Sequence, residues 1–228
     1  MIVAANAFVN AYLQSDFFGK MIFWALFFLS VASWMIILYK MWQMSQVRRL
    51  SRSFAELFSE KKEEPLHFQY TSLPLKLGVS HPFFEVYKTA KQHSLQMFRN
   101  RDHLTPSDLQ LVESQTLFMA SSQCKELERN LYLLSTIATL GPFFGLLGTV
   151  WGILLSLSQM PKGLMNNSSM LSGLSMALAT TVIGLVIAIP ALVGYNYLRN
   201  AHREYKRELD QFSHLLLAAI EIQHRKDG

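Results

Sequence analysis

The sequence predicts an all-α membrane protein with three transmembrane helices and long cytoplasmic helical extensions. Half of the 228 residues are hydrophobic and only 16% are charged, a balance that is typical of membrane proteins. A helix needs about 20 mainly apolar residues to cross a bilayer core of about 30 Å. Three stretches without Asp, Glu, Lys or Arg approach or exceed that length, at residues 21–39, 131–161 and 163–198.

The first transmembrane helix is expected at residues 17–40, after a short periplasmic N-terminus at residues 1–16. Its core is crowded with Phe, Leu, Ile and Trp. Residues 1–19 have no basic start, and no small-residue cleavage site follows Tyr39, which argues against a cleaved signal peptide. We therefore expect this helix to stay attached as an anchor.

Residues 41–130 are expected to form a cytoplasmic helical region. Apolar residues at helical spacing continue the first helix out of the membrane: Val47, Leu50, Phe54, Leu57 and Phe58. Pro65 should end that helix, and a short helix should follow from about Phe83 to Arg99.

Thr105 is a suitable N-cap for a further helix, with Pro106 in its first position and Asp108 in its first turn. No strong helix breaker occurs before Gly141, so this helix is expected to continue without interruption into the second transmembrane helix.

The remaining expected segments are a second transmembrane helix at 131–160, a periplasmic turn at 161–170, a third transmembrane helix at 171–198 and a cytoplasmic helical tail at 199–228. The tail carries an apolar stripe, formed by Leu209, Phe212, Leu216 and Ile220. Such a stripe must pack against another surface. Either the helix that starts near Thr105 or a neighbouring copy of the chain would serve.

Basic residues give the orientation. Ten Lys and Arg residues flank the three spans on the proposed cytoplasmic side, against Lys20 and Lys162 on the other. This asymmetry predicts that the N-terminus is outside and that residues 41–130 and the C-terminal tail are inside, where the basic residues beside the spans meet anionic lipid. The net charge of +5 therefore needs no nucleic acid to explain it.

Nothing in the sequence indicates an enzyme, a cofactor or a metal site. Phosphate-binding glycine loops after a strand are missing, and the seven histidines show no metal-ligand spacing and are expected at surface positions. All acidic residues lie outside the uncharged stretches, so no carboxylate pair suggests hydrolysis within the membrane.

Small residues follow one face of each of the last two spans. The second span carries Gly141, Gly145, Gly148 and Gly152, and the third carries Ala177, Thr181, Gly184 and Ala188. Small faces let helix backbones approach closely in lipid. We interpret these faces as close-packing seams through which copies of the chain form a symmetric oligomer.

Polar residues in the same spans have two interpretations. The second span contains Ser135, Thr139, Pro142 and Thr149, and the third contains Ser172, Ser175, Thr180 and Thr181. Their hydroxyls either return to a carbonyl one turn back in their own helix or line a polar path between helices.

Two stretches resemble the signature helices of the TolQ/ExbB proteins, which belong with MotA in one proton channel family. They are LGPFFGLLGTVWGI at residues 140–153 and GLSMALATTVIGLVIAIPALVGYN at residues 173–196. The three spans and the short outer N-terminus resemble TolQ more than ExbB or MotA. The resemblance covers the C-terminal half closely, whereas the first half agrees in topology and little else.

The resemblance implies a homopentamer in the bacterial inner membrane whose second and third spans line a pore around the single helices of a TolR/ExbD-like partner. An aspartate on that partner carries protons, and proton flow drives work on a TolA/TonB-like protein. By position, Thr149 and Thr181 match the pore threonines, and Thr180 and Ser175 are expected on the same polar path. Pro142 matches the family's kink, while Met176 replaces a glutamate.

Three functions remain open at this stage. The leading one is a stator subunit that couples proton-motive force to mechanical work on an envelope-spanning protein. The second is an oligomeric scaffold that has lost coupling with Met176 and only positions its partners. The third is a channel through the spans of this chain alone, which the absence of charge or backbone coordination disfavours.

Overall fold

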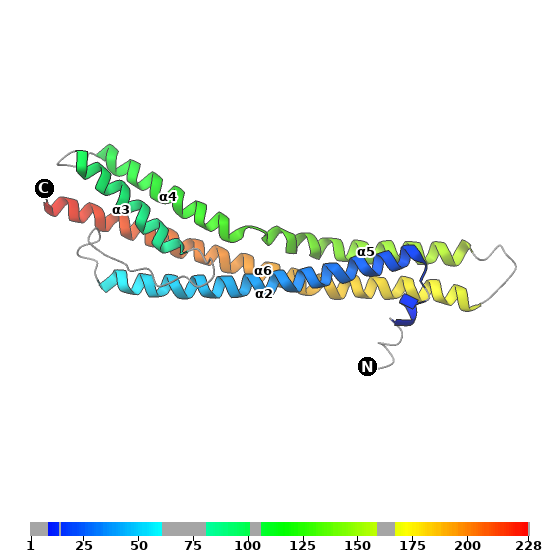
Figure 1. Cartoon of the computed structure of the whole chain (residues 1–228). Coiled ribbons are helices and arrows are strands. Elements are labelled where there is room, and N and C mark those ends of the chain that lie inside the picture. The colour runs from blue at the N-terminus through cyan, green and yellow to red at the C-terminus, as the bar shows by residue number, and fades with distance from the viewer. Residues whose placement is uncertain (1–8, 14, 61–80, 101–105, 159–166, 228) are drawn as a thin grey trace. The chain divides into compact units, whose positions relative to one another are not determined.

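The structure is a computed structural model that describes residues 9–13, 15–60, 81–100, 106–158 and 167–227. After a helical turn at residues 9–13, the described residues form five longer helices (Figure 1): α2 (Phe17–Glu60), α3 (Pro82–Asn100), α4 (Pro106–Glu128), α5 (Leu131–Ser158) and α6 (Asn167–Asp227). No strand occurs among the described residues, and three of their helical stretches are long and apolar enough to cross a membrane. The predicted fold class is therefore confirmed.

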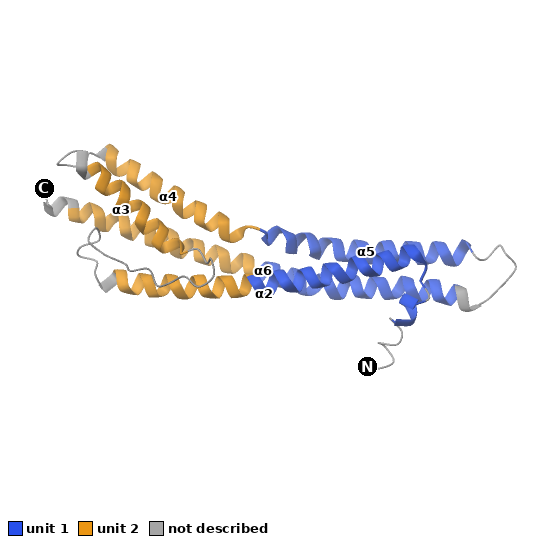
Figure 2. Ribbon diagram, viewed as in Figure 1, with its two compact units in different colours: residues 1–39, 130–197 blue, residues 40–129, 198–228 orange. Residues whose placement is uncertain are grey.

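The chain divides into two compact units (Figure 2). Unit 1 comprises residues 1–39 and 130–197, and unit 2 comprises residues 40–129 and 198–228. Helices α2 and α6 contribute to both units, whereas α5 belongs to unit 1 and α3 and α4 belong to unit 2. The divisions fall beside the expected ends of the three transmembrane segments.

Unit 1 turns many large apolar side chains outward. Phe28 is 63% exposed, Leu146 58% and Val186 62%. A water-soluble unit rarely exposes contiguous apolar surface of this extent, whereas lipid tails accommodate it without cost. The outward surface of unit 1 thus suits a bilayer.

Unit 2 has its own aromatic core, built from α2, α3, α4 and α6. Phe54 of α2 is fully buried, and its ring lies 5.9 Å from Tyr87 of α3 and 5.8 Å from Phe212 of α6. Burying a ring of this size stabilises a fold by roughly 1.5–3 kcal/mol. The predicted outward-running helix is confirmed in α2, except that Leu57 is 43% exposed because Phe58 takes the core position.

The apolar stripe on the tail packs within the chain. All four of its residues are buried in the core of unit 2: Leu209, Phe212, Leu216 and Ile220. Their partners include residues of α2 and α3 as well as Ala120, Cys124 and Leu127 of α4. Of the two alternatives, the stripe therefore packs against α4 of the same chain. Helices α2 and α3 also contact it.

The helix bounds agree with expectation at two places. Helix α3 spans the predicted short helix, and α4 begins at Pro106 with Asp108 in its first turn. The expected cap Thr105 and the expected stop Pro65 lie outside the described residues. Helix α2 itself ends at Glu60.

One expectation is wrong: α4 does not continue into α5. Helix α4 ends at Glu128, and Asn130 adopts a φ of 68° before α5 begins at Leu131. A positive φ cannot continue a right-handed helix, and asparagine tolerates it better than most residues. The backbone N–H of Arg129 bonds to the Glu126 carbonyl at 3.2 Å, which closes the last turn of α4.

Lys40 secures that helix end. Its Nζ donates to the carbonyl oxygen of Leu127 at 2.8 Å and to Oε1 of Gln43 at 3.1 Å. Leu127 lies in the last turn of α4, where carbonyls have no partner within the helix. A positive charge is also favourable at a helix C-terminus. The break between α4 and α5 is thus stabilised by a residue from α2.

His202 of α6 is an exception to the expected surface placement of the histidines. It is 4% exposed, and its Nε2 atom has no hydrogen-bond partner within the described part of the chain. Burial, together with the smaller effect of the positive charges of Lys40 and Arg48, lowers the pKa of His202 from 6.5 to about 4. His81 is also buried, at 5% exposed.

We expect mild acid to destabilise unit 2 through His202. The unfolded chain keeps an ordinary histidine pKa of about 6.5, so below that pH it binds more protons than the folded chain. The loss starts near pH 6.5, reaches at most about 3 kcal/mol near pH 4, and is absent above pH 6.5. Thermal unfolding in detergent from pH 7.5 to 5 should show a flatter decline for His202→Gln. The exposed control His214→Gln should follow the wild type, and an unaltered slope in His202→Gln would contradict this assignment.

Candidate functional site

The glycine face of α5 packs directly against the small-residue face of α6. The two helices are antiparallel, because Gly141 faces Gly184 whereas Gly152 faces Gly173. A Cβ atom on Gly184 would lie 2.5 Å from the Gly141 carbonyl oxygen, and one on Gly152 would lie 2.5 Å from that of Gly173. Ala177 and Ala188 complete the seam, at Gly152 and Gly141 respectively. Only glycine permits this backbone approach.

The seam is therefore occupied within one chain. Our interpretation of these faces as contacts between copies is wrong, because α5 and α6 of the same chain already cover them. The small residues lie where the backbones of α5 and α6 approach each other closely. The spacing of the small residues does not show which surface covers them. A short connection between two consecutive spans favours their packing as an antiparallel pair.

Thr180 belongs to this seam. It is fully buried, and its side chain occupies the space beside Gly148, where a Cβ atom would lie 2.2 Å from the threonine Oγ1. The hydroxyl donates to carbonyl oxygens of its own helix, at 2.9 Å from Ala177 and 3.0 Å from Met176. Thr180 is thus a packing residue and offers no hydroxyl to an open surface.

Thr149 and Thr181 lie on one flank of the helix pair. A helix turns by about 100° per residue, so each of these threonines is rotated out of the seam from its neighbour, Gly148 or Thr180. In an antiparallel pair, the residue that directly follows a seam residue lies on the same side of the pair in both helices. Pro142 directly follows Gly141 and therefore lies on this same side. Pro142, Thr149 and Thr181 are all half-buried. We call Pro142, Thr149 and Thr181 the threonine flank.

The hydroxyls of this flank are held by carbonyl groups. Thr149 Oγ1 donates to the Leu146 oxygen of its own helix at 2.7 Å, and Thr181 Oγ1 donates across the pair to the Gly145 oxygen at 3.1 Å. Each oxygen retains lone pairs that accept a further hydrogen bond. Ser175, by contrast, is exposed about half a turn away from the seam of α6, so the structure does not bring it to this flank.

Helix α2 covers the opposite flank. Ile22 and Leu26 pack with Ile137 of α5 and Ile187 of α6 in one buried cluster. Met176 also points to this side, since it is 2% exposed and its Sδ would lie 2.8 Å from a Cβ atom on Gly19. The threonine flank is therefore the side of the pair that α2 leaves open, and Met176 is turned away from it.

Asp16 is a residue that the sequence analysis did not single out. Its carboxylate accepts the backbone N–H of Gly19 at 2.9 Å, which caps α2, and Trp151 Nε1 donates to its two oxygens at 3.0 and 3.2 Å. The cap has a sequence signal, an Asp just before an apolar run. The contact with Trp151, 135 residues away, has none. Asp16 thus anchors the start of α2 to α5.

The spans of the two helices contain two prolines, Pro142 and Pro190, and no acidic or basic side chain. Pro142 lies inside α5, where its missing N–H leaves the carbonyl four residues earlier without its usual donor. Residues 131–158 and 167–198 contain no Asp, Glu, Lys or Arg. Within the described residues no cluster of His, Cys, Asp or Glu has the arrangement of a metal site. The available chemistry is hydrogen bonding by hydroxyls in an apolar setting.

Comparisons with known proteins agree on one family. Residues 88–211, more than half of the chain, match the MotA/TolQ/ExbB proton channel family. The chain is 44% identical over 81 residues to the biopolymer transport protein ExbB of Aquifex aeolicus, which covers 35% of this chain and 55% of the relative. It is 31% identical over 147 residues to ExbB of Neisseria gonorrhoeae, covering 60% and 65%.

A third relative aligns over nearly the full length. The Tol-Pal system protein TolQ of Haemophilus influenzae is 26% identical over 221 residues, which covers 92% of this chain and 93% of TolQ. The chain spans only 55% and 65% of the two ExbB relatives. The family match and the three apolar helices together show that this chain is a multi-pass inner-membrane protein of the MotA/TolQ/ExbB proton channel family.

Proposed function

We propose that this chain is a stator subunit that couples proton-motive force to mechanical work on an envelope-spanning protein. The observation that carries this proposal is the threonine flank, where α5 and α6 present two hydroxyls on the side that α2 leaves open. Membership of a proton channel family supports it. The chain is proposed to act without enzymatic chemistry, cofactor or metal.

The proton carrier belongs to a partner in this proposal, because the spans of α5 and α6 contain no Asp, Glu, His, Lys or Arg. A carboxylate at membrane depth costs several kcal/mol unless hydrogen-bonding groups or water solvate it. The oxygens of Thr149 and Thr181 can accept a hydrogen bond from the protonated aspartic acid, and each hydroxyl can donate to the charged carboxylate when it leaves its carbonyl partner. A single helix carrying one aspartate would therefore gain most by lying along the threonine flank.

The proposed partners follow from the family resemblance. They are a TolR/ExbD-like single-span protein that carries the aspartate, a TolA/TonB-like protein that receives the force, further copies of this chain in a homopentamer, and the lipid bilayer. Nucleic acid has no role. The pentamer now rests on the resemblance alone, since the glycine seam is occupied within one chain.

Co-purification tests this partnership. The chain is extracted in mild detergent together with a single-span protein that is encoded beside it and has an aspartate in its span. Native mass measurement should show five copies of this chain with that partner. A mass equal to one chain alone, or a partner lost at detergent concentrations that keep the oligomer intact, would refute the proposed assembly.

The orientation is proposed from the asymmetry of ten basic residues against two around the spans. In a Cys124→Ala background, we expect a cysteine at Asn167 to react with a membrane-impermeant maleimide added to intact spheroplasts. A cysteine at the exposed Gln92 should react only after lysis. The reverse pattern would place unit 2 outside the cell.

A non-conducting scaffold is the second candidate, and one observation favours it. Met176 stands where the family resemblance implies a glutamate, and the structure buries it against Gly19. A thioether neither binds nor releases a proton. If the scaffold alternative holds, the same assembly forms but the threonine hydroxyls have no effect on proton movement.

A further inference from the structure

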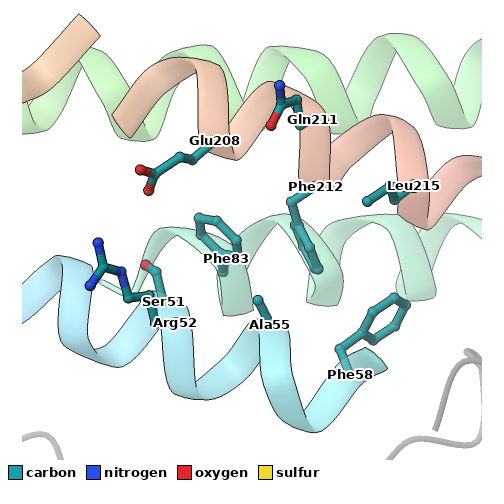
Figure 3. A pocket seen from close by; sticks show the side chains of 9 residues that line it. All are labelled: Ser51, Arg52, Ala55, Phe58, Phe83, Glu208, Gln211, Phe212 and Leu215. Atoms are coloured by element: carbon teal, nitrogen blue, oxygen red, sulfur yellow. The ribbon is translucent and has the colours of Figure 1, made fainter. Parts of the chain in front are cut away.

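Unit 2 has a cavity of about 330 Å³ that opens to the surface between α2, α3 and α6 (Figure 3). Its walls are mainly apolar and include Ala55, Phe58, Phe83, Phe212 and Leu215. The ring of Phe212 stacks on Phe83 with 4.6 Å between centroids and lies 5.4 Å from Phe58. Small-molecule pockets of about 300–1,000 Å³ typically have such apolar, aromatic walls and a few placed polar groups.

The charged side chains of the cavity are gathered at one end. Arg52 of α2 and Glu208 of α6 lie at that end in Figure 3, whereas Phe58 and Leu215 lie at the other. Among the described residues, neither Arg52 nor Glu208 forms an ion pair within 4.0 Å. The cavity is therefore amphipathic along its length and has both signs of charge at its polar end.

Helices α2 and α6 are in closer contact one helical turn before the cavity. Arg48 and Glu204 precede Arg52 and Glu208 by four residues on the same two helices, and they form an ion pair at 3.0 Å. Between these two levels, Ser51 and Tyr205 are hydrogen-bonded at 2.8 Å. The helices are thus in direct contact up to the cavity, where the next pair of opposite charges stays apart.

We propose that this cavity binds a single-chain zwitterionic phospholipid of the lysophosphatidylethanolamine class. Its phosphate would pair with Arg52, its ammonium with Glu208, and its hydrocarbon chain would lie against the aromatic wall. Arginine is well suited to phosphate because its donors form a planar fork. A purely anionic amphiphile would be opposed by Glu208, and a purely cationic one by Arg52.

The size of the cavity favours one hydrocarbon chain over two, because its volume lies near the lower end of the range for ligand pockets. The proposal is independent of proton coupling. It concerns unit 2 alone, and a failure of the stator assignment would leave it standing.

Headgroup selectivity provides the test. The full chain, in nanodiscs of diacyl phosphatidylcholine, is titrated with lauroyl lysophosphatidylethanolamine, laurate or dodecylammonium, which differ mainly in headgroup, and bound probe is counted per chain by native mass spectrometry. We expect one zwitterionic probe per chain, with about tenfold weaker binding of each singly charged probe. Equal affinity for all three would show non-specific partition and overturn the proposal.

Matched variants locate the binding. Arg52→Gln and Glu208→Gln should each weaken binding of the zwitterionic probe about tenfold. Arg203→Gln, a change at an exposed position of α6 outside the cavity, should leave the affinity unchanged. The exchange Arg52→Glu with Glu208→Arg keeps both charges and should restore most of the affinity. Wild-type affinity in both single variants would show that this cavity is not the site.

Discussion

Leucine in place of Gly148 is expected to abolish the accumulation of folded protein. Even a Cβ atom at this position would lie 2.2 Å from Oγ1 and 2.5 Å from Cβ of Thr180, which is itself fully buried. Overpacking of a tight contact costs about 1–3 kcal/mol or more, a large share of a typical stability of about 5–15 kcal/mol. The measurement is the amount of membrane-inserted protein and its unfolding temperature in detergent.

Two variants separate this clash from a general intolerance of bulk. Gly148→Ala should destabilise the chain by a smaller amount, and adding Thr180→Gly should recover part of the loss, because it removes all three threonine atoms nearest to the new Cβ. Val150→Leu adds bulk on the same helix at a site that is 59% exposed and should be neutral. If Gly148→Leu were as stable as Val150→Leu, the intrachain seam would be wrong.

The double change Thr149→Val with Thr181→Val is expected to abolish partner-dependent function while leaving the fold intact. Valine keeps the shape of threonine and removes the hydroxyl. The loss of the Thr181 bond to Gly145 should cost only about 0.6 kcal/mol, the typical value for a hydrogen bond between membrane helices. A partner aspartate on the threonine flank would lose both neighbouring hydroxyls. The measurements are proton uptake by vesicles that contain both proteins, and the unfolding temperature.

Ser175→Ala is the matched control for this change. It also removes a hydroxyl from α6, but at an exposed position away from the threonine flank, and it should retain activity. Met176→Glu should lower the unfolding temperature, because it buries a carboxylate against Gly19 of α2 on the side away from the threonine flank. Full activity in the double valine variant would show that these hydroxyls serve only their own helices, and the scaffold alternative would then lead.

The sequence predicted the helices and their apolar faces well because these depend on local spacing. Phe54 belongs to a set of apolar residues at helical spacing on α2, and Phe212 and Leu216 belong to another on α6; all three are buried as that spacing requires. The glycine positions on α5 and the small positions on α6 were likewise visible as faces. The period of an α-helix is independent of tertiary context, so such faces can be identified before their partners are known.

What the sequence did not predict depends on contacts between distant residues. The break at Asn130 needs a positive φ and the Lys40 contact with the Leu127 carbonyl, 87 residues apart, and no glycine or proline marks it. Thr180 and Thr181 are adjacent and chemically identical, so only the packing of α5 and α6 separates a seam residue from a flank residue. The burial of His202 follows in the same way from the packing of unit 2.

The most direct test of the central claim is partner-dependent proton flux. Vesicles with a potassium gradient and an internal pH-sensitive dye are prepared with this chain alone, with the single-span partner alone, or with both, and valinomycin is added to start the flux. We expect proton uptake only when both proteins are present. Uptake should be lost when the partner's aspartate is changed to asparagine, and also when this chain carries both Thr149→Val and Thr181→Val. Uptake by this chain alone, or equal uptake with the doubly substituted chain, would contradict a stator in which the threonine flank serves a proton carried by the partner.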